Sequence, residues 1–160
     1  MNDLERAIRL RESGQLEEAK TVLLELLTQE PLNPSAWYQC AWVHDVMELE
    51  REAIPYYKRA LEMDLRHEER QGAYLGLGST LRTLGRYEEA KLIFEEAISK
   101  YPDRREYQVF YAMVRFNQNA YNEAMEIVLK QLADTSSDKG IQEYKNAIHF
   151  YSDKLNKVWD

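Results

Sequence analysis

Apolar residues recur along this 160-residue chain at steps of three and four, the spacing that places side chains on one face of an α-helix. Trp37, Cys40 and His44 show the pattern. Asn33 and Pro34 precede them as a favourable helix start, because an asparagine side chain accepts a hydrogen bond from the first turn and proline presets φ. The pattern predicts an all-α fold.

A small residue with acidic neighbours returns four times at a nearly constant interval. The intervals are 34, 37 and 34 residues, and the four residues are Ala19, Ala53, Ala90 and Ala124. The residues five positions before these alanines are Gly14, Glu48, Gly85 and Asn119. Those four positions after them are Leu23, Tyr57, Phe94 and Val128. This period indicates stacked units, each made of a helix, a turn and a second helix.

The repeated residues resemble the tetratricopeptide repeat, a 34-residue unit with the pattern W-x2-L-G-x2-Y…A-x3-F…P. The third unit is nearest to it, with Tyr74, Leu77, Gly78, Leu81, Ala90, Phe94 and Pro102. The resemblance implies an α-solenoid of four repeats in a single domain, residues 1–160. The repeats would span about residues 1–33, 34–67, 71–104 and 105–138. The strings QCAWVHDV and GLGSTLRTLGRYEEA also resemble small, free-standing bacterial members of the family, which are thought to act as dimers.

Two segments fall outside the regular period. Three extra residues lie within RHEERQG, a string without proline, so we expect them to lengthen the helix before Leu84 into the longest of its kind. In residues 139–159, apolar residues at steps of three and four predict one amphipathic helix that caps the stack. This helix either only caps or also contacts a second copy, in which case the contact residues would be Tyr144, Ile148, Tyr151, Leu155 and Trp159.

The glycine-rich string GAYLGLGSTLRTLGRYEEA invites comparison with a phosphate-binding loop. A dinucleotide site would need a third glycine at Leu81 after a strand, and a P-loop would need a glycine at Thr83 followed by lysine. Both are missing. We interpret Gly78 as a packing residue and Gly85 as a helix end with positive φ.

Charge and reactive side chains narrow the function further. The net charge of −7 disfavours nucleic acid, and no apolar run is long enough to span a membrane. The first ten residues lack the features of an export signal, so we expect a cytoplasmic protein. Cys40 and His44 lie on an apolar helix face, which predicts a buried inert thiol and a core imidazole. No pattern for a metal, a cofactor or catalysis is present, so we expect no enzyme.

The family resemblance implies a concave groove, lined by the first helices of successive repeats, that holds a peptide or a partner helix. The expected groove residues are Leu4, Ile8, Arg11, Tyr38, Trp42, Asp45, Leu75, Ser79, Arg82, Val109, Met113, Phe116 and Asn117. Aromatic residues and methionine on such a surface favour protein partners, unless they only line the stack.

Three functions remain open. The first is a non-enzymatic module that binds a protein or peptide partner in its groove, as a homodimer. The second is self-assembly, with the groove or the final helix occupied by another copy. The third is a regulatory or peptide-sensing subunit.

Overall fold

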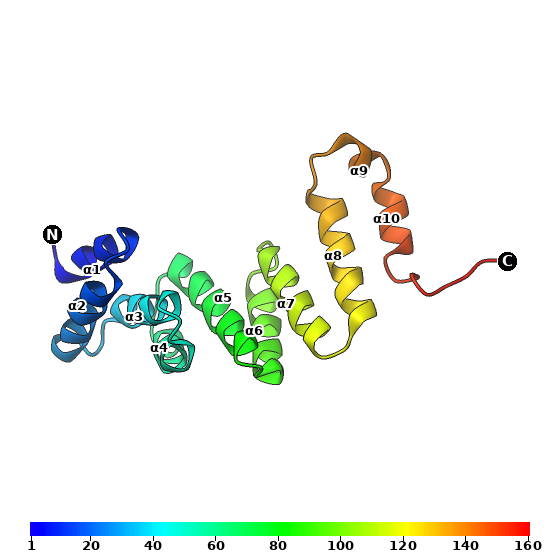
Figure 1. Ribbon diagram of the computed structural model, residues 1–160. Coiled ribbons are helices and arrows are strands. Elements are labelled where there is room, and N and C mark those ends of the chain that lie inside the picture. Colours follow the sequence, from blue (N-terminus) through cyan, green and yellow to red (C-terminus); the bar gives the residue numbers. More distant parts are fainter. The chain divides into compact units, whose positions relative to one another are not determined.

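The computed structural model describes all residues 1–160, which form ten α-helices and no strand (Figure 1). The helices are α1 (Asp3–Glu12), α2 (Leu16–Gln29), α3 (Pro34–Val46), α4 (Glu50–Glu62), α5 (His67–Thr83), α6 (Tyr87–Lys100), α7 (Glu106–Asn117), α8 (Tyr121–Thr135), α9 (Lys139–Glu143) and α10 (Lys145–Tyr151). The predicted all-α fold is confirmed. The chain divides within α6 into two compact units, Met1–Ile93 and Phe94–Asp160. The single-domain assignment stays a prediction.

The predicted turn residues end the first helix of each repeat in the same way. Gly14, Glu48, Gly85 and Asn119 all have positive φ, between 59° and 80°. At the first turn, the Gln15 amide donates to the Leu10 carbonyl at 2.8 Å, and the Gly14 amide donates to the Arg11 carbonyl at 3.0 Å. The other three turns repeat this pair of hydrogen bonds. It is the Schellman motif, which requires one residue in the left-handed region.

The first unit is built from α1 to α5 and the beginning of α6. Its helices pack closely because alanines lie where they meet: Ala7, Ala19, Ala41, Ala53 and Ala90 have no exposed surface. Helix α3 starts at Pro34 with the Asn33 side chain accepting from the Ala36 amide, as predicted. Helix α5 has 17 residues and is the longest of the ten, which confirms that the insert extends a helix.

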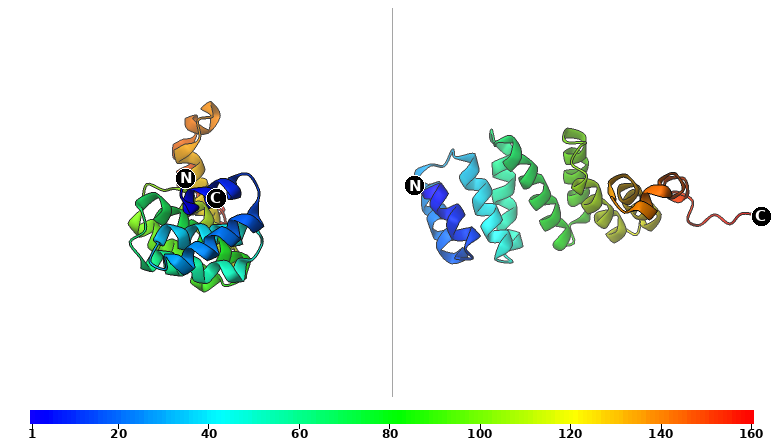
Figure 2. Two further views of the ribbon diagram at one scale, coloured as in Figure 1. Left: turned by 90° about the vertical axis from the view of Figure 1, so that its left-hand side faces the viewer. Right: turned by 90° about the horizontal axis from the view of Figure 1, so that it is seen from above.

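The second unit contains the end of α6 and helices α7 to α10. Phe94 of α6 is fully buried, and its ring lies 6.2 Å from that of Phe110 on α7. Helices α8 and α10 lie side by side and run in opposite directions (Figures 1 and 2).

The prediction of one helix over residues 139–159 is wrong. The chain forms α9, breaks at Tyr144, and forms α10, which ends at Tyr151. The apolar spacing suggested a straight helix, but polar contacts turn the chain back over the end of α8. The Gln142 side-chain amide donates to the carbonyls of Ala133 and Ser136. At the other end of α10, the Ser152 hydroxyl and the Lys154 ammonium donate to the carbonyls of His149 and Phe150.

Candidate functional site

The first helices of three repeats, α1, α3 and α5, lie next to one another in the first unit. We call the side chains predicted there the inner surface. They are Leu4, Ile8, Arg11, Tyr38, Trp42, Asp45, Leu75, Ser79 and Arg82. Tyr38 is buried, and the other eight are half-buried.

Four of these residues belong to one chain of contacts. The Arg11 guanidinium lies 3.6 Å from the centre of the Trp42 ring, and its Nε donates to Gln39 Oε1 at 3.2 Å. The Trp42 ring lies 5.7 Å from Tyr38, and Tyr38 lies 6.4 Å from Tyr57 on α4. The Tyr57 hydroxyl donates to Asp45 Oδ2 at 3.0 Å. Arginine stacked on an aromatic face makes a rigid surface with both apolar and cationic character.

Asp45 joins three helices. It accepts hydrogen bonds from Tyr57 of α4 and, at 3.1 Å, from the Thr80 hydroxyl of α5. Burial raises the pKa of its carboxyl group, although the two hydroxyl donors act in the opposite direction. Asp45 therefore positions the helices, with two acceptor sites already used inside the molecule.

Two glycines of α5 make room for the tyrosines. A Cβ atom on Gly76 would lie 2.8 Å from Tyr57 Cε1 and closer still to the end of the ring. One on Gly72 would lie 3.1 Å from Tyr38 Cζ and overlap its hydroxyl. Burial raises the pKa of the Tyr38 hydroxyl to about 12, so this phenol stays neutral. Tyr38 thus packs against α5 and offers a partner little surface, whereas Trp42 is half-buried and the Arg11 side chain is 11% exposed.

Polar and reactive groups elsewhere in this unit are also engaged internally. The His44 ring is buried, contacts the Cys40 carbonyl at 2.7 Å and stacks on Tyr56, as predicted for a core imidazole. Burial raises the pKa of the Cys40 thiol to about 12, which leaves it a poor nucleophile. The structure has no group of three or more side chains that could hold a metal ion.

The predicted groove residues of the second unit lie on α7. Val109 and Asn117 are half-buried, whereas Met113 and Phe116 are 39% and 57% exposed. The Phe116 ring makes an edge-to-face contact at 5.1 Å with Tyr121, the first residue of α8. These two exposed residues continue onto an apolar face of α8 that sequence reasoning missed, formed by Tyr121, Met125, Val128 and Leu132.

Most of the predicted contact residues of the C-terminal segment are exposed. Tyr144, Tyr151, Leu155 and Trp159 are 48% to 62% exposed, and Ile148 is half-buried. The Tyr151 and Trp159 rings meet edge to face at 5.7 Å, so the tail folds back on the end of α10.

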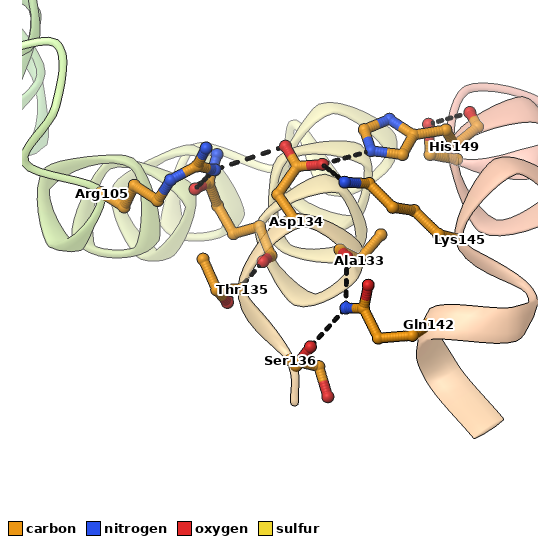
Figure 3. Close-up of polar contacts among 10 residues, drawn as sticks. Arg105, Ala133, Asp134, Thr135, Ser136, Gln142, Lys145 and His149 are labelled. Atoms are coloured by element: carbon orange, nitrogen blue, oxygen red, sulfur yellow. Dashed lines mark hydrogen bonds and ion pairs between the residues drawn. The ribbon is translucent and has the colours of Figure 1, made fainter. Parts of the chain in front are cut away.

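Asp134 of α8 holds the segment in place (Figure 3). Its carboxylate lies 2.7 Å from His149 Nε2 and 3.7 Å from Lys145 Nζ, both on α10, and 3.3 Å from the Arg105 guanidinium. Hydrogen bonds from His149 and Arg105 lower the pKa of Asp134 below its usual value. Asp134 therefore ties α10 to α8 through His149 and Lys145.

The geometry defines a class of protein: a repeat of helical hairpins with alanines at the crossings. The family model described as "Tetratrico peptide repeat" matches residues 34–155. The chain therefore belongs to the tetratricopeptide repeat family, whose members are generally non-catalytic scaffolds.

Solved structures share this fold at low sequence identity. MamA from Desulfovibrio magneticus RS-1 has a TM-score of 0.75 and 15% identity, over 98% of this chain and 89% of MamA. PilF from Pseudomonas aeruginosa has a TM-score of 0.70 and 20% identity, over 99% of this chain and 76% of PilF. YrrB, described as a repeat protein "with an unusual peptide-binding site", has a TM-score of 0.64 and 16% identity, over 98% of this chain and 91% of YrrB. No curated protein matches the sequence.

None of the ten helices is both long and apolar enough to cross a lipid bilayer.

Proposed function

We propose that this protein is a non-enzymatic interaction module that binds a peptide or a helix of a partner protein on the inner surface of the first unit. The family membership supports protein binding in general. The observation that carries the finer proposal is the stack of Arg11 on Trp42 within the first unit. YrrB, which shares the fold, is described as having a peptide-binding site.

The chemistry of these residues suits a segment with both apolar and acidic side chains. Trp42 provides a large apolar ring, and such side chains dominate binding energies in protein interfaces. Arg11 is held by Gln39 and Trp42, so less of its freedom would be lost on binding a carboxylate.

The test begins with peptides selected from a display library against the intact protein. Binding of each selected peptide is then measured for the wild type and Trp42→Ala. We expect the substitution to weaken binding at least about tenfold, because hot-spot aromatics contribute about 2 kcal/mol or more.

Leu92→Ala is the matched control, because Leu92 is a 62% exposed apolar residue on the second helix of a repeat. It should leave binding unchanged, and all variants should retain the helical circular dichroism signal of the wild type. Peptides that bind Trp42→Ala as tightly as the wild type would exclude the inner surface.

A second function, self-association, is favoured by the distribution of exposed apolar residues. In the first unit the exposed large apolar residues are few and scattered. The second unit has twelve of them between Met113 and Trp159, and the rest of its surface is mostly polar. Contiguous exposed apolar surface marks interaction sites. Sedimentation equilibrium tests this function directly. A protein that is still monomeric at tens of micromolar would show that self-association is not its function.

A further inference from the structure

The outward face of α8 is unlike that of the other second helices. Its six exposed residues are Tyr121, Asn122, Met125, Val128, Leu132 and Thr135, and none carries a charge. The corresponding helices α2 and α4 expose mainly charged and polar residues, as surface helices ordinarily do. The charged residues of α8 are half-buried and paired inside the molecule: Glu123 with Arg115, Glu126 with Lys130, and Asp134 with His149.

The position of this face in the repeat explains what it would contact. Counted from the repeated alanine of this unit, Ala124, the apolar residue Tyr121 lies three positions before it. Met125, Val128 and Leu132 lie one, four and eight positions after it. In the first three repeats none of the twelve residues at these positions is exposed; the residues four after the alanine, Leu23, Tyr57 and Phe94, are at most 2% exposed. Leu23 and Leu27 belong to a core shared with α3, the first helix of the next repeat. The apolar residues of α8 thus form the face on which a repeat receives its neighbour.

Helix α10 does not cover that face. It packs on the side of α8 that contains Glu126, Lys130 and Ala133, which lie two, six and nine positions after Ala124. All nine residues at these positions in the first three repeats are exposed. The expected capping of the stack is therefore not what the structure shows: α10 lies on the outer side, and the neighbour-facing side stays open.

We propose that a second copy of this chain covers the open face, with the two α8 helices antiparallel about a two-fold axis. This proposal rests on the self-association suggested above and assigns it a surface. The steps between Tyr121, Met125, Val128 and Leu132 are four, three and four, the same in both directions along the helix. Antiparallel helices then place Met125 against the partner's Val128 and Tyr121 against the partner's Leu132, as a two-fold contact requires.

The available area is sufficient for such a contact. With an area on the order of 200 Å² for a fully accessible large side chain, Met113, Phe116 and the four α8 residues present about 550 Å². Their exposed fractions are 39% to 57%. A symmetric pair would bury about 1,100 Å², just above the roughly 1,000 Å² at which specific interfaces begin.

Head-to-tail stacking of copies is disfavoured by the other end of the chain. In that arrangement α1 of the second copy would lie on α8. The residues of α1 that correspond to Trp37 and Cys40 of α3 are Asp3 and Arg6, both exposed. Placing two charged side chains on an uncharged apolar face would remove them from water without partners.

A charge exchange across the proposed axis tests both the surface and the register. Sedimentation velocity is measured for the wild type, Val128→Glu, Met125→Lys and the double variant. We expect a wild-type dimer and about a hundredfold weaker association of Val128→Glu, because two unpaired carboxylates would be buried. In the double variant each lysine faces the partner's glutamate, so the dimer should return and should weaken as salt is added.

Two controls separate the alternatives. Leu24→Glu alters a 39% exposed residue of α2, and Leu155→Glu alters an exposed residue of the C-terminal segment; both should leave the dimer intact. A monomeric wild type would remove self-association as a function. A dimer that survives Val128→Glu but not Leu155→Glu would assign the contact to the C-terminal segment. Failure of the double variant to recover would overturn the antiparallel register.

Discussion

Single residues determine how closely the helices of this protein approach. The repeated alanines and the four turn positions were predictable from their spacing in the sequence, and positive φ was predicted for Gly85. The roles of Gly72 and Gly76 were not predictable, because nothing in the sequence shows which aromatic ring lies against a glycine within a helix. Only the structure shows that Tyr38 and Tyr57 fill the space at these positions.

Gly76→Ala tests this packing. Alanine ordinarily stabilises a helix by about 1 kcal/mol over glycine. Here we expect a net loss of about 1 to 3 kcal/mol in the free energy of unfolding, because the added Cβ overlaps a Tyr57 ring that is 2% exposed and hydrogen bonded to Asp45.

Urea denaturation measures the effect, and Gly140→Ala is the control. Its Cβ would meet only the Asp138 carboxylate, at 3.2 Å, on an exposed helix. A Gly76→Ala variant more stable than the wild type would show that Tyr57 relaxes easily and that the glycine is not required.

At the scale of the elements, local signals located the first eight helices and failed at the last two. The helix pairs follow from turns, caps and periodicity, all of which are local in sequence. The break between α9 and α10 depends on contacts with α8, fifteen residues distant in the case of His149 and Asp134. A seven-residue helix is too short to be stable alone, so these contacts decide its existence.

Asp134→Ala should therefore release α10 while leaving α7 and α8 folded. We expect faster amide hydrogen exchange in residues 145–151 and unchanged exchange in α8. Asp153→Ala, which removes an exposed pair with Lys154, should have no such effect.

The pH dependence of the same contact has a defined sign. The pKa of Asp134 is lowered in the folded protein, so its stabilising contribution is complete above the ordinary aspartate value of 3.8 and is lost as the pH falls through the lowered value. Protection of α10 that persists in acid, or in Asp134→Ala, would show that apolar contacts hold the helix.

At the scale of the whole molecule, function depends on which surfaces remain uncovered. Eight of the nine predicted groove residues of the first unit are half-buried and Tyr38 is buried, whereas the exposed apolar residues concentrate on α7, α8 and the C-terminal segment. The sequence alone did not indicate the face of α8, because its residues match core positions of the earlier repeats. They become a surface only because α10 packs on the opposite side.

Disulfide cross-linking is the most direct test of the proposed two-fold contact. Met125→Cys and Val128→Cys proteins are oxidised separately and as an equal mixture, with Cys40 buried and unreactive. If Met125 faces the partner's Val128, the mixture should form covalent dimers far more readily than either variant alone. Equal cross-linking in all three samples, or none, would contradict the antiparallel α8 interface.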